Sequence, residues 1–459
     1  MIPDPAGPGR FHYAGVGGSG MSALAQFQVR LGGRASGSDR SFDSGGREEA
    51  KAQLEAAGVT LFPQDGSGAR GPDCTALVVS TAVEAEVPDM VAARAHGVPV
   101  VHRSELLARF VARYRTIAIS GTSGKSSVVA MTFEILRGAG LRPSVITGGD
   151  LVLLQREGLW GNAWYGGSDL LVVEADESDG SLVRYAPAVG VVLNLQRDHR
   201  EMDEVAAMFA TLRRRTREAF VVGEDPRLAD LATSGTVFGF GPHSDVRGEK
   251  VELGPEGSAF EVGGVRFSLP APGRHNVENA LAAIATCRAV GVALADMVAP
   301  LAAFQGVGRR FQSLGRTRGI EVVDDFAHNP AKVSAAFETA RRRAARVLAI
   351  YQPHGYGPTR FLRRDFVESF VSALGPEDRL WLLEIFYAGG TAQRDFSAAD
   401  MVGEIAARGC TAEFAPSRPW LIARIAEVAR EGDLVLIMGA RDPSLTDFAQ
   451  AIRAKLAEH

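Results

Sequence analysis

The sequence is poor in cysteine: it has three, and they stand far apart. Cys74, Cys287 and Cys410 form no CxxC pair, and no histidine or cysteine spacing typical of a zinc site accompanies them. This pattern excludes a disulfide framework and gives no support to a structural zinc centre. Isolated thiols are typical of buried apolar positions in a reducing compartment, so we expect a cytoplasmic protein.

Long apolar runs and a strong charge of one sign are also missing. The first residues lack the basic and apolar regions of an export signal, and no stretch of about eighteen residues is apolar enough to span a bilayer. A net charge of −4 gives no electrostatic footprint for nucleic acid or an anionic membrane. We therefore expect no nucleic-acid partner and no membrane insertion. What the chain does have is size: 459 residues, 46% of them hydrophobic, suffice for roughly three domains.

A glycine-rich turn joins an apolar, strand-like run to a helix-like segment. It reads Gly121-Thr122-Ser123-Gly124-Lys125-Ser126-Ser127. Backbone N–H groups of such a turn point at a phosphate, the lysine adds a positive charge, and the hydroxyl after it can complete a Mg2+ shell. The usual phosphate loop has a glycine where this chain has Ile119, so the motif is a variant. It predicts a nucleoside triphosphate site; the alternative is a turn that only caps a helix.

A second glycine turn near the N-terminus follows the dinucleotide-binding pattern. It consists of Gly15, Gly17, Gly18, Ser19, Gly20 and Met21, and Ser38 and Asp39 follow about twenty residues later. An acid at that place can accept a hydrogen bond from a ribose hydroxyl. A tight strand-to-helix turn without a ligand is the alternative.

Two further apolar runs end in polar residues. Residues 170–173 lead into Glu174-Ala175-Asp176-Glu177-Ser178-Asp179, and residues 189–193 lead to Asp198-His199. Ligands bind at the carboxyl ends of strands in open α/β sheets. Ser126, Glu174 and His199 therefore make a plausible Mg2+ environment, although histidine is less usual for so hard a cation. Otherwise the acids cap turns and His199 is a loop residue.

Strand-like runs alternate with helix-like segments along the whole chain, which indicates parallel sheets covered by helices, an α/β fold. We expect domains at residues 1–112, 113–312 and 313–459. Asn276 and Asn279 lie on one face of a helix-like segment, where an amide can pair with an adenine edge. Capping explains Asn276 equally well. In the last third we expect strands at residues 320–324, 347–351, 380–383 and 434–438.

The order of these motifs resembles the Mur ligases, ATP-dependent amide-forming enzymes of peptidoglycan synthesis, and most closely their L-alanine-adding branch. The strings that carry the likeness span almost the whole chain. They are the two glycine turns, the acid cluster after residue 173, Asp198-His199, Gly273-Arg274-His275-Asn276-x-x-Asn279 and Gly306-Val307-Gly308-Arg309-Arg310-Phe311. The resemblance implies an N-terminal Rossmann-like domain that binds a UDP-sugar, a central P-loop ATPase domain and a C-terminal Rossmann-like ligase domain.

The resemblance also implies the reaction and its residues. L-alanine would be joined to the carboxylate of UDP-N-acetylmuramate through an acyl phosphate, with ATP and Mg2+ as cofactors. Lys125 would bind the β- and γ-phosphates, Ser126 and Glu174 the metal, and His199 a second metal. The other implied ATP contacts are the rest of the turn at 121–127, Asn279 at adenine, Arg310 at the phosphates and Asp324 or Asp325 at the ribose. His328 and His354 would lie near the incoming amino acid, and either could accept its proton. The first glycine turn, with Ser38 and Asp39, would hold the UDP-sugar.

Some residues depart from the family pattern. Gly355 and Pro358 stand where the family usually has arginines that face substrate carboxylates, so Arg360, Arg363 or Arg364 would have to replace them. The segment Asp325-Phe326-Ala327-His328-Asn329-Pro330 is closer to other members, including the ligase that adds a recycled tripeptide. Glycine, serine or that tripeptide thus remain alternative acceptors, and a non-catalytic nucleotide-binding relative remains possible. The absence of lysine between Arg200 and Phe220 agrees with the alanine-adding branch. Either a monomer or a homodimer fits the sequence.

Overall fold

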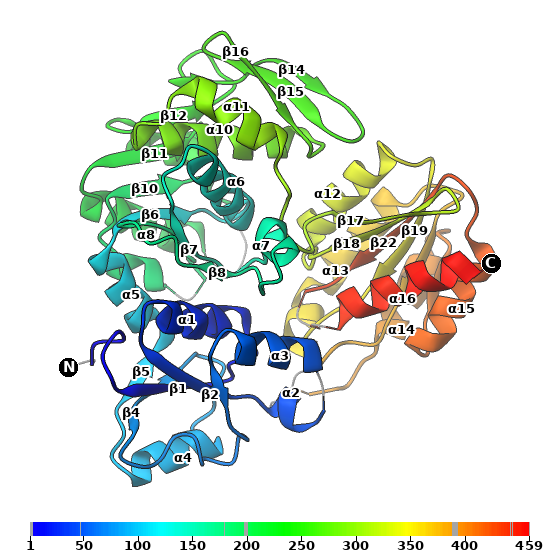
Figure 1. Cartoon of the computed structure of the whole chain (residues 1–459). Helices are drawn as coiled ribbons and strands as arrows, with labels where there is room; N and C mark the ends of the chain where they lie inside the picture. The colour runs from blue at the N-terminus through cyan, green and yellow to red at the C-terminus, as the bar shows by residue number, and fades with distance from the viewer. Residues whose placement is uncertain are drawn as a thin grey trace. The chain divides into compact units, whose positions relative to one another are not determined.

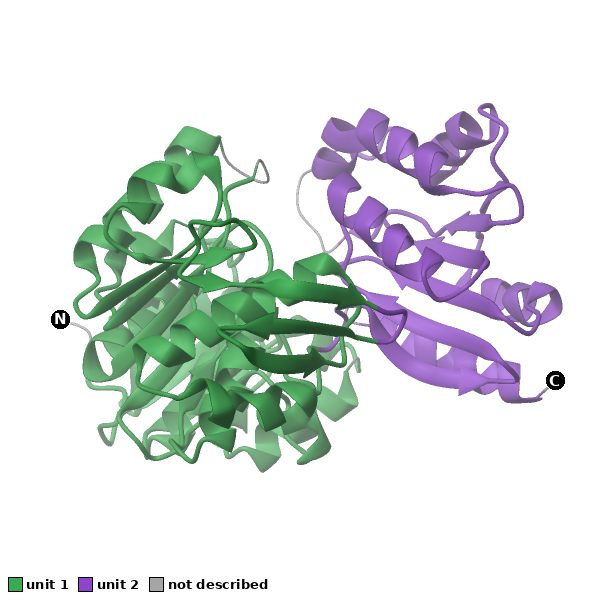
Figure 2. Cartoon of the chain, turned by 90° about the horizontal axis from the view of Figure 1, so that it is seen from above, with its two compact units in different colours: residues 1–253, 257–307 green, residues 254–256, 308–459 purple. Residues whose placement is uncertain are grey.

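The computed structural model describes residues 3–45, 47–178, 180–196, 201–387, 393–440, 442 and 444–458. The chain separates into two compact units, coloured differently in Figure 2. Unit 1 comprises residues 1–253 and 257–307, and unit 2 comprises residues 254–256 and 308–459.

Unit 1 begins with a five-stranded sheet in the order β3-β2-β1-β4-β5, in which every pairing is parallel. Its strands are Arg10–Ala14 (β1), Arg34–Ser38 (β2), Thr60–Leu61 (β3), Cys74–Val79 (β4) and Val100–His102 (β5). Its helices are Ser19–Arg30 (α1), Arg40–Asp43 (α2), Glu48–Ala56 (α3), Pro88–Ala95 (α4) and Arg103–Arg113 (α5). The first glycine turn therefore connects β1 to α1 at the carboxyl edge of this sheet.

The second sheet of unit 1 has eight strands in the order β13-β12-β11-β10-β6-β9-β7-β8. All pairings given for it are parallel except that of β7 with β8. Its strands are Arg115–Ser120 (β6), Ser144–Ile146 (β7), Ala163–Trp164 (β8), Leu170–Glu174 (β9), Val189–Val192 (β10), Ala219–Gly223 (β11), Thr236–Gly239 (β12) and Val246–Arg247 (β13). The central strands β6, β9 and β10 are almost continuously buried, as expected for a parallel sheet with both faces covered.

Helices cover this sheet, and a small antiparallel sheet in the order β14-β15-β16 follows it in the chain. The helices are Lys125–Gly138 (α6), Val152–Arg156 (α7), Met202–Arg215 (α8), Ala229–Ala232 (α9), Arg274–Ala289 (α10) and Leu294–Ala302 (α11), with 3-10 turns at Ser181–Arg184 (η1) and Pro226–Leu228 (η2). The small strands are Glu249–Leu253 (β14), Ser258–Val262 (β15) and Val265–Leu269 (β16). The α10 surface is rich in alanine, so it can pack closely on α6 (Figure 1).

One apolar cluster extends from the first sheet of unit 1 into the second. Phe27 on α1 and Phe110 on α5 meet edge to face at 5.0 Å, and the same cluster contains Trp160, Leu171 and Phe209. This shared core explains why both sheets belong to one compact unit.

Unit 2 contains a six-stranded sheet in the order β17-β18-β22-β19-β20-β21, parallel except for the β17–β18 pair. Its strands are Gln312–Thr317 (β17), Ile320–Asp325 (β18), Arg346–Tyr351 (β19), Arg379–Leu382 (β20), Ala412–Phe414 (β21) and Asp433–Met438 (β22). Its helices are Pro330–Arg341 (α12), Tyr356–Ala373 (α13), Ala398–Ala406 (α14), Arg418–Val428 (α15) and Leu445–Glu458 (α16).

The α/β fold predicted from the sequence is confirmed, and the four strands expected in the last third occur within one or two residues of their predicted bounds. The small sheet β14–β16 and the antiparallel strand β17 were not predicted from the sequence. Within the described ranges, no helix has the length and apolar character needed to cross a membrane.

Candidate functional site

The glycine turn between β6 and α6 has a backbone that side chains would obstruct. Gly121 and Gly124 have φ angles of 142° and 85°, in the region that favours glycine. A Cβ atom on Gly124 would lie 2.4 Å from the amide oxygen of Asn279. The turn therefore leaves backbone N–H groups accessible at the start of a fourteen-residue helix, where a phosphate is favoured.

Lys125, the first residue of α6, lies among carboxylates. Its Nζ atom is 2.6 Å from Glu177 Oε2 and 3.4 Å from Asp176 Oδ1, and it donates to the carbonyl of Gly121 at 2.8 Å. Burial lowers the pKa of Lys125, but the charges of Asp176, Glu177 and Glu174 outweigh that effect and hold it above its ordinary value. The lysine is thus a permanent cation at the phosphate loop.

Ser126, in the first turn of α6, lies beside Glu174, the last residue of β9. The Ser126 hydroxyl lies 3.1 Å from both carboxylate oxygens of Glu174. Glu174 Oε2 also accepts hydrogen bonds from Thr147 Oγ1 at 2.8 Å and from the backbone N–H of Gly148 at 3.0 Å. The carboxylate is therefore fixed in orientation beside the phosphate loop. His199, the third predicted metal ligand, lies outside the described residues.

Asn194 holds the conformation of the phosphate loop. Its Oδ1 accepts from the Thr122 hydroxyl and from the Ser123 N–H, both at 2.9 Å, and its Nδ2 donates to the Ser123 carbonyl at 3.2 Å. The backbone N–H of Gln196 donates to Thr122 Oγ1 at 2.9 Å. Asn194 is not among the site residues predicted from the sequence, although a polar residue just after a buried strand was a usable signal.

The two asparagines of α10 have different surroundings. Asn279 lies against Gly124, so its amide reaches the phosphate loop. Asn276 instead donates from Nδ2 to the carbonyl of Pro272 at 2.7 Å, and the N-cap position belongs to Gly273. Asn276 thus braces the segment before the helix without capping it.

The first glycine turn has the predicted shape, and its acid has local partners. Asp39 Oδ2 accepts from the Gly17 N–H at 3.0 Å, while Oδ1 accepts from the Ser41 N–H at 2.9 Å and caps α2. Ser38 is fully buried and donates to Asp89 at 2.5 Å. Gly15 has a φ of 74°, and Gly18 precedes α1, which begins with Ser19, Gly20 and the buried Met21. Asp39 therefore orders the turn, whatever it contributes to a ligand.

In unit 2, Arg310 lies in a turn with an unusual backbone. Its neighbours Arg309 and Phe311 have φ angles of 57° and 47°, which non-glycine residues rarely adopt and which are common at functional sites. Asp325 holds this turn by accepting from the N–H groups of Phe311 at 2.6 Å and Ala327 at 2.7 Å. Burial raises the pKa of Asp325 to about 6, against the opposing charge of Arg310.

The other predicted residues of unit 2 divide into a buried acid and a histidine pair. Asp324 is fully buried, lies 3.3 Å from Arg309 and accepts from Thr446 Oγ1 at 2.7 Å. The rings of His328 and His354 meet with centroids 5.7 Å apart. Unit 2 thus presents two imidazoles side by side at the carboxyl ends of β18 and β19.

The arginines that could replace the missing family arginines have acidic neighbours. Arg360 forms an ion pair with Asp395, and Arg363 lies 2.6 Å from Glu404. Both guanidinium groups also lie over the ring of Phe396. Their charges are therefore partly balanced within unit 2, which makes them weaker candidates for binding a substrate carboxylate.

Comparison with known proteins decides the family. Residues 10–115 match the Mur ligase family catalytic domain, residues 119–287 the Mur ligase middle domain, and residues 309–441 the Mur ligase glutamate ligase domain. The chain belongs to the Mur ligase family. This confirms the resemblance found in the sequence and the three-domain α/β architecture that it implied.

Individual relatives align with this Mur ligase over nearly its whole length. The UDP-N-acetylmuramate:L-alanine ligase of Pelotomaculum thermopropionicum is 34% identical over 94% of this chain and 94% of its own length. The solved UDP-N-acetylmuramate:alanine ligase MurC of Thermotoga maritima has a TM-score of 0.80 at 25% identity, covering 98% of this chain and 99% of that one. A murein peptide ligase of Psychrobacter arcticus has a TM-score of 0.72 at 21% identity with the same coverage, and it shares the fold.

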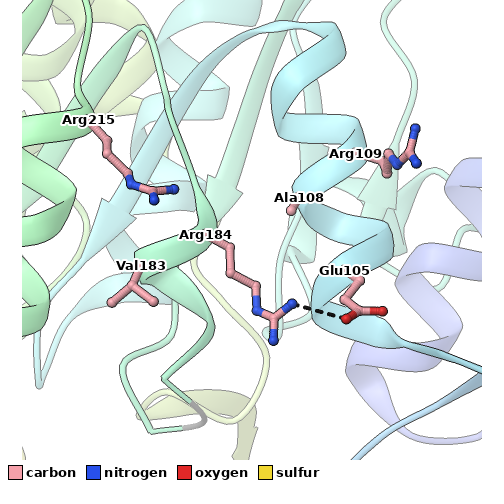
Figure 3. Close-up of a pocket in the computed structure, with 6 residues that line it drawn as sticks. All are labelled: Glu105, Ala108, Arg109, Val183, Arg184 and Arg215. Atoms are coloured by element: carbon pink, nitrogen blue, oxygen red, sulfur yellow. Dashed lines mark hydrogen bonds and ion pairs between the residues drawn. The ribbon is translucent and has the colours of Figure 1, made fainter. Parts of the chain in front are cut away.

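A surface hollow of about 480 Å³ lies elsewhere on the Mur ligase, between α5 and η1 (Figure 3). In Figure 3 the Arg184 side chain turns toward Glu105, which it contacts at 3.1 Å, and the Arg109 guanidinium points away from the hollow. Its lining residues are Glu105, Ala108, Arg109, Val183, Arg184 and Arg215. None of them belongs to the predicted site, so the chemistry is to be sought at the phosphate loop.

Proposed function

We propose that this Mur ligase joins L-alanine to the carboxylate of UDP-N-acetylmuramate at the expense of ATP, in peptidoglycan synthesis. One observation carries the proposal: Lys125, Ser126 and Glu174 gather at one glycine turn in a chain 34% identical over 94% of its length to an enzyme of that name. The proposed UDP-sugar turn lies in the same compact unit. UDP-N-acetylmuramate and an amino acid are thus its proposed partners. A cytoplasmic location and a monomeric or dimeric state stay predictions.

The residues beside the phosphate loop suit a magnesium ion. The hydroxyl of Ser126 and the carboxylate of Glu174 are hard oxygen donors only 3.1 Å apart. Among the described residues no group of three or more His, Cys, Asp or Glu side chains could hold a metal. Two protein oxygens are nevertheless what Mg2+ needs when substrate phosphates supply the rest. We propose that Ser126 and Glu174 hold it and that His199 helps position a second metal. A bound ion would neutralise charge on the transferred phosphoryl group.

The first step activates the sugar carboxylate, a poor electrophile. A carboxylate oxygen attacks the γ-phosphorus of ATP, a new P–O bond forms, and the bond from the γ-phosphorus to the β,γ-bridging oxygen breaks, which releases ADP. Lys125 is proposed to bind the β- and γ-phosphates, and Arg310 is a further proposed phosphate contact. Because charge spreads over the moving group, catalysis depends mainly on such positioned cations. Asn279 and Asp324 or Asp325 are the proposed contacts of adenine and ribose.

The second step forms the amide. The amine of the amino acid attacks the acyl carbon, and inorganic phosphate leaves as the C–O bond breaks. The nitrogen must lose a proton, and His328 or His354 can accept it near neutral pH. The Nδ1 atom of His328 lies 2.8 Å from the carbonyl of Phe326, which can only accept a hydrogen bond. In the neutral ring Nδ1 therefore carries the hydrogen, and Nε2 is the basic atom.

The acceptor is the part of the proposal that needs a direct test. Gly355 and Pro358 provide no cation for an acceptor carboxylate, and Arg360 and Arg363 are already paired with acids. The protein should be incubated with ATP, Mg2+ and UDP-N-acetylmuramate and offered alanine, glycine, serine or the recycled tripeptide. Product masses and ADP would be measured together. A product heavier by one alanine residue with matching ADP supports the proposal. A product with another amine would assign a different acceptor. No product with any amine overturns the proposal.

A further inference from the structure

Asn162 is a fully buried polar residue in the segment just before β8. Its side-chain Nδ2 donates to the Ser19 carbonyl at 2.9 Å and to the Ser22 hydroxyl at 2.8 Å. Its Oδ1 accepts from Gln26 Nε2 at 3.0 Å. Ser19, Ser22 and Gln26 lie on one face of α1, the helix that begins in the first glycine turn.

The backbone of Asn162 is connected to Glu174, a proposed Mg2+ ligand, through Thr147. Its carbonyl accepts from the backbone N–H of Thr147 at 3.0 Å. Thr147 in turn donates from Oγ1 to Glu174 at 2.8 Å. A short, continuous set of hydrogen bonds therefore runs from the first turn of α1 through Asn162 and Thr147 to Glu174. Figure 1 shows α1 lying next to β7 and β8, and Thr147 directly follows β7 while Asn162 directly precedes β8.

The middle of the connection, between its ends at Ser19 and Glu174, is buried, which makes it stiff and costly to break. Asn162 and Ser22 are fully buried, Gln26 is 2% exposed and Thr147 is 3% exposed. The Asn162 amide uses both its donors and its acceptor, so no polar group of that side chain is left unpaired. Replacing it removes one hydrogen-bond partner from each of Ser19, Ser22 and Gln26. Buried polar groups that lose a partner favour a rearrangement that restores it.

The proposed reaction needs this kind of stiffness. The sugar carboxylate and the γ-phosphate are held by loops of two different sheets, yet they must meet in line at near-contact distance. A misplacement of about 1 Å can cost on the order of 100-fold in rate. Resting on the proposed function, we propose that Asn162 is a positioning residue that fixes the sugar-nucleotide turn of α1 relative to Glu174 and the phosphate loop. Asn162 touches no reacting atom itself.

Steady-state kinetics of Asn162→Leu and Asn162→Asp, beside a matched control, test this inference. Leu removes all three side-chain hydrogen bonds at similar volume, and Asp keeps the acceptor for Gln26 while losing both donors. The control is Gln28→Leu, on the same helix. Gln28 is also fully buried, but it bonds Tyr13 on β1 and the carbonyl of Pro5 in the segment before β1.

The expected result is a split between kcat and KM. For Asn162→Leu we expect kcat to fall about 30-fold or more, with the KM values for ATP and UDP-N-acetylmuramate within about threefold of wild type. Asn162→Asp should show a smaller loss of kcat in the same direction. Gln28→Leu should lower the thermal unfolding midpoint about as much as Asn162→Leu does. Its kcat should stay within about twofold of wild type.

The outcomes separate this inference from the proposed function. Wild-type turnover in the same assay tests the function, and the ratio of variant to wild type tests Asn162. If wild type forms product and both Asn162 variants keep its kcat, or lose no more than Gln28→Leu, the positioning role is overturned. If Asn162→Leu does not fold, the Asp variant decides by the same criterion. If wild type forms no product with any amine, the function fails and the inference falls with it.

Discussion

The carboxylate of Glu177 lies 2.6 Å from the ammonium group of Lys125, and these side chains are only 6% and 12% exposed. The two charges compensate each other in a place where neither could remain unpaired at low cost. Glu177 was part of the acid cluster seen in the sequence, but its pairing with the phosphate-loop lysine depends on how β6 and β9 lie side by side.

Replacing the lysine should therefore destabilise the fold as well as abolish activity. We expect Lys125→Met to lower the free energy of unfolding by about 3 kcal/mol, because the buried Glu177 loses its counter-charge. Adding Glu177→Gln should recover most of this stability and none of the activity. Thermal melts and ADP production of the two variants check this. A Lys125→Met protein as stable as wild type would contradict the role given to the pair.

Ser126 offers a test of the metal site. Ser126→Ala removes the hydroxyl that lies 3.1 Å from Glu174, so we expect kcat to fall about 100-fold and the Mg2+ concentration for half-maximal activity to rise. Ser126→Thr keeps the hydroxyl and is the matched control, with activity within about threefold of wild type. Mg2+ titrations of ADP production distinguish the two. Equal losses in both variants would point to altered packing around position 126 as the cause.

Replacing Asn194 should raise the KM for ATP more than the KM values for the other substrates. Its amide oxygen accepts from two groups of the phosphate loop, and Asn194→Ala leaves Thr122 Oγ1 and the Ser123 N–H without that partner. We expect the KM for ATP to rise about 30-fold, since two lost hydrogen bonds at about 1 kcal/mol each amount to about 2 kcal/mol. The KM for UDP-N-acetylmuramate should stay within about twofold. A uniform rise in both KM values would refute a specific role at the loop.

The sequence predicted those parts of the site that are local in the chain. The phosphate loop and Glu174 follow directly after apolar strands, so periodicity and glycine placement were enough to locate them. Asn162 gave no such signal, because its importance arises from contacts with α1, more than 130 positions earlier. Thr147 likewise gains its role only because β7 lies beside β9.

The small sheet β14–β16 was missed for a different reason. In β15 burial alternates strictly, whereas β14 has one partly buried residue and four exposed ones. A short strand with three charged residues out of five resembles a loop in a single sequence, and only its partner strands fix its conformation. In unit 2 the reverse held: β18, β19 and β22 are buried throughout or nearly so, and their apolar runs were readable.

Glu134 gives the Mur ligase a predictable dependence of stability on pH. This carboxyl lies on α6, is 7% exposed and accepts from the backbone N–H of Gln305 at 3.2 Å, while its Oε1 has no hydrogen-bond partner. Burial raises the pKa of Glu134 from 4.5 to about 8, although Gln305, Arg137 and Arg156 act to lower it. The folded protein therefore holds this proton more tightly than the unfolded chain does.

The sign of the effect follows from that difference. Below pH 4.5 the carboxyl is protonated in both states, and its contribution to stability is fully present. Between pH 4.5 and about 8 only the unfolded chain releases the proton, so stability falls by up to about 1.4 kcal/mol per pH unit. Glu134→Gln cannot titrate and can still accept from Gln305, so it should gain stability relative to wild type as the pH rises. Thermal unfolding midpoints of both proteins at pH 5, 6, 7 and 8 measure this gain as a difference between variant and wild type. The titration of Asp325 and the other carboxyls is common to both proteins, so it cancels in that difference. Parallel curves would mean that Glu134 is ionised in the folded protein throughout this range.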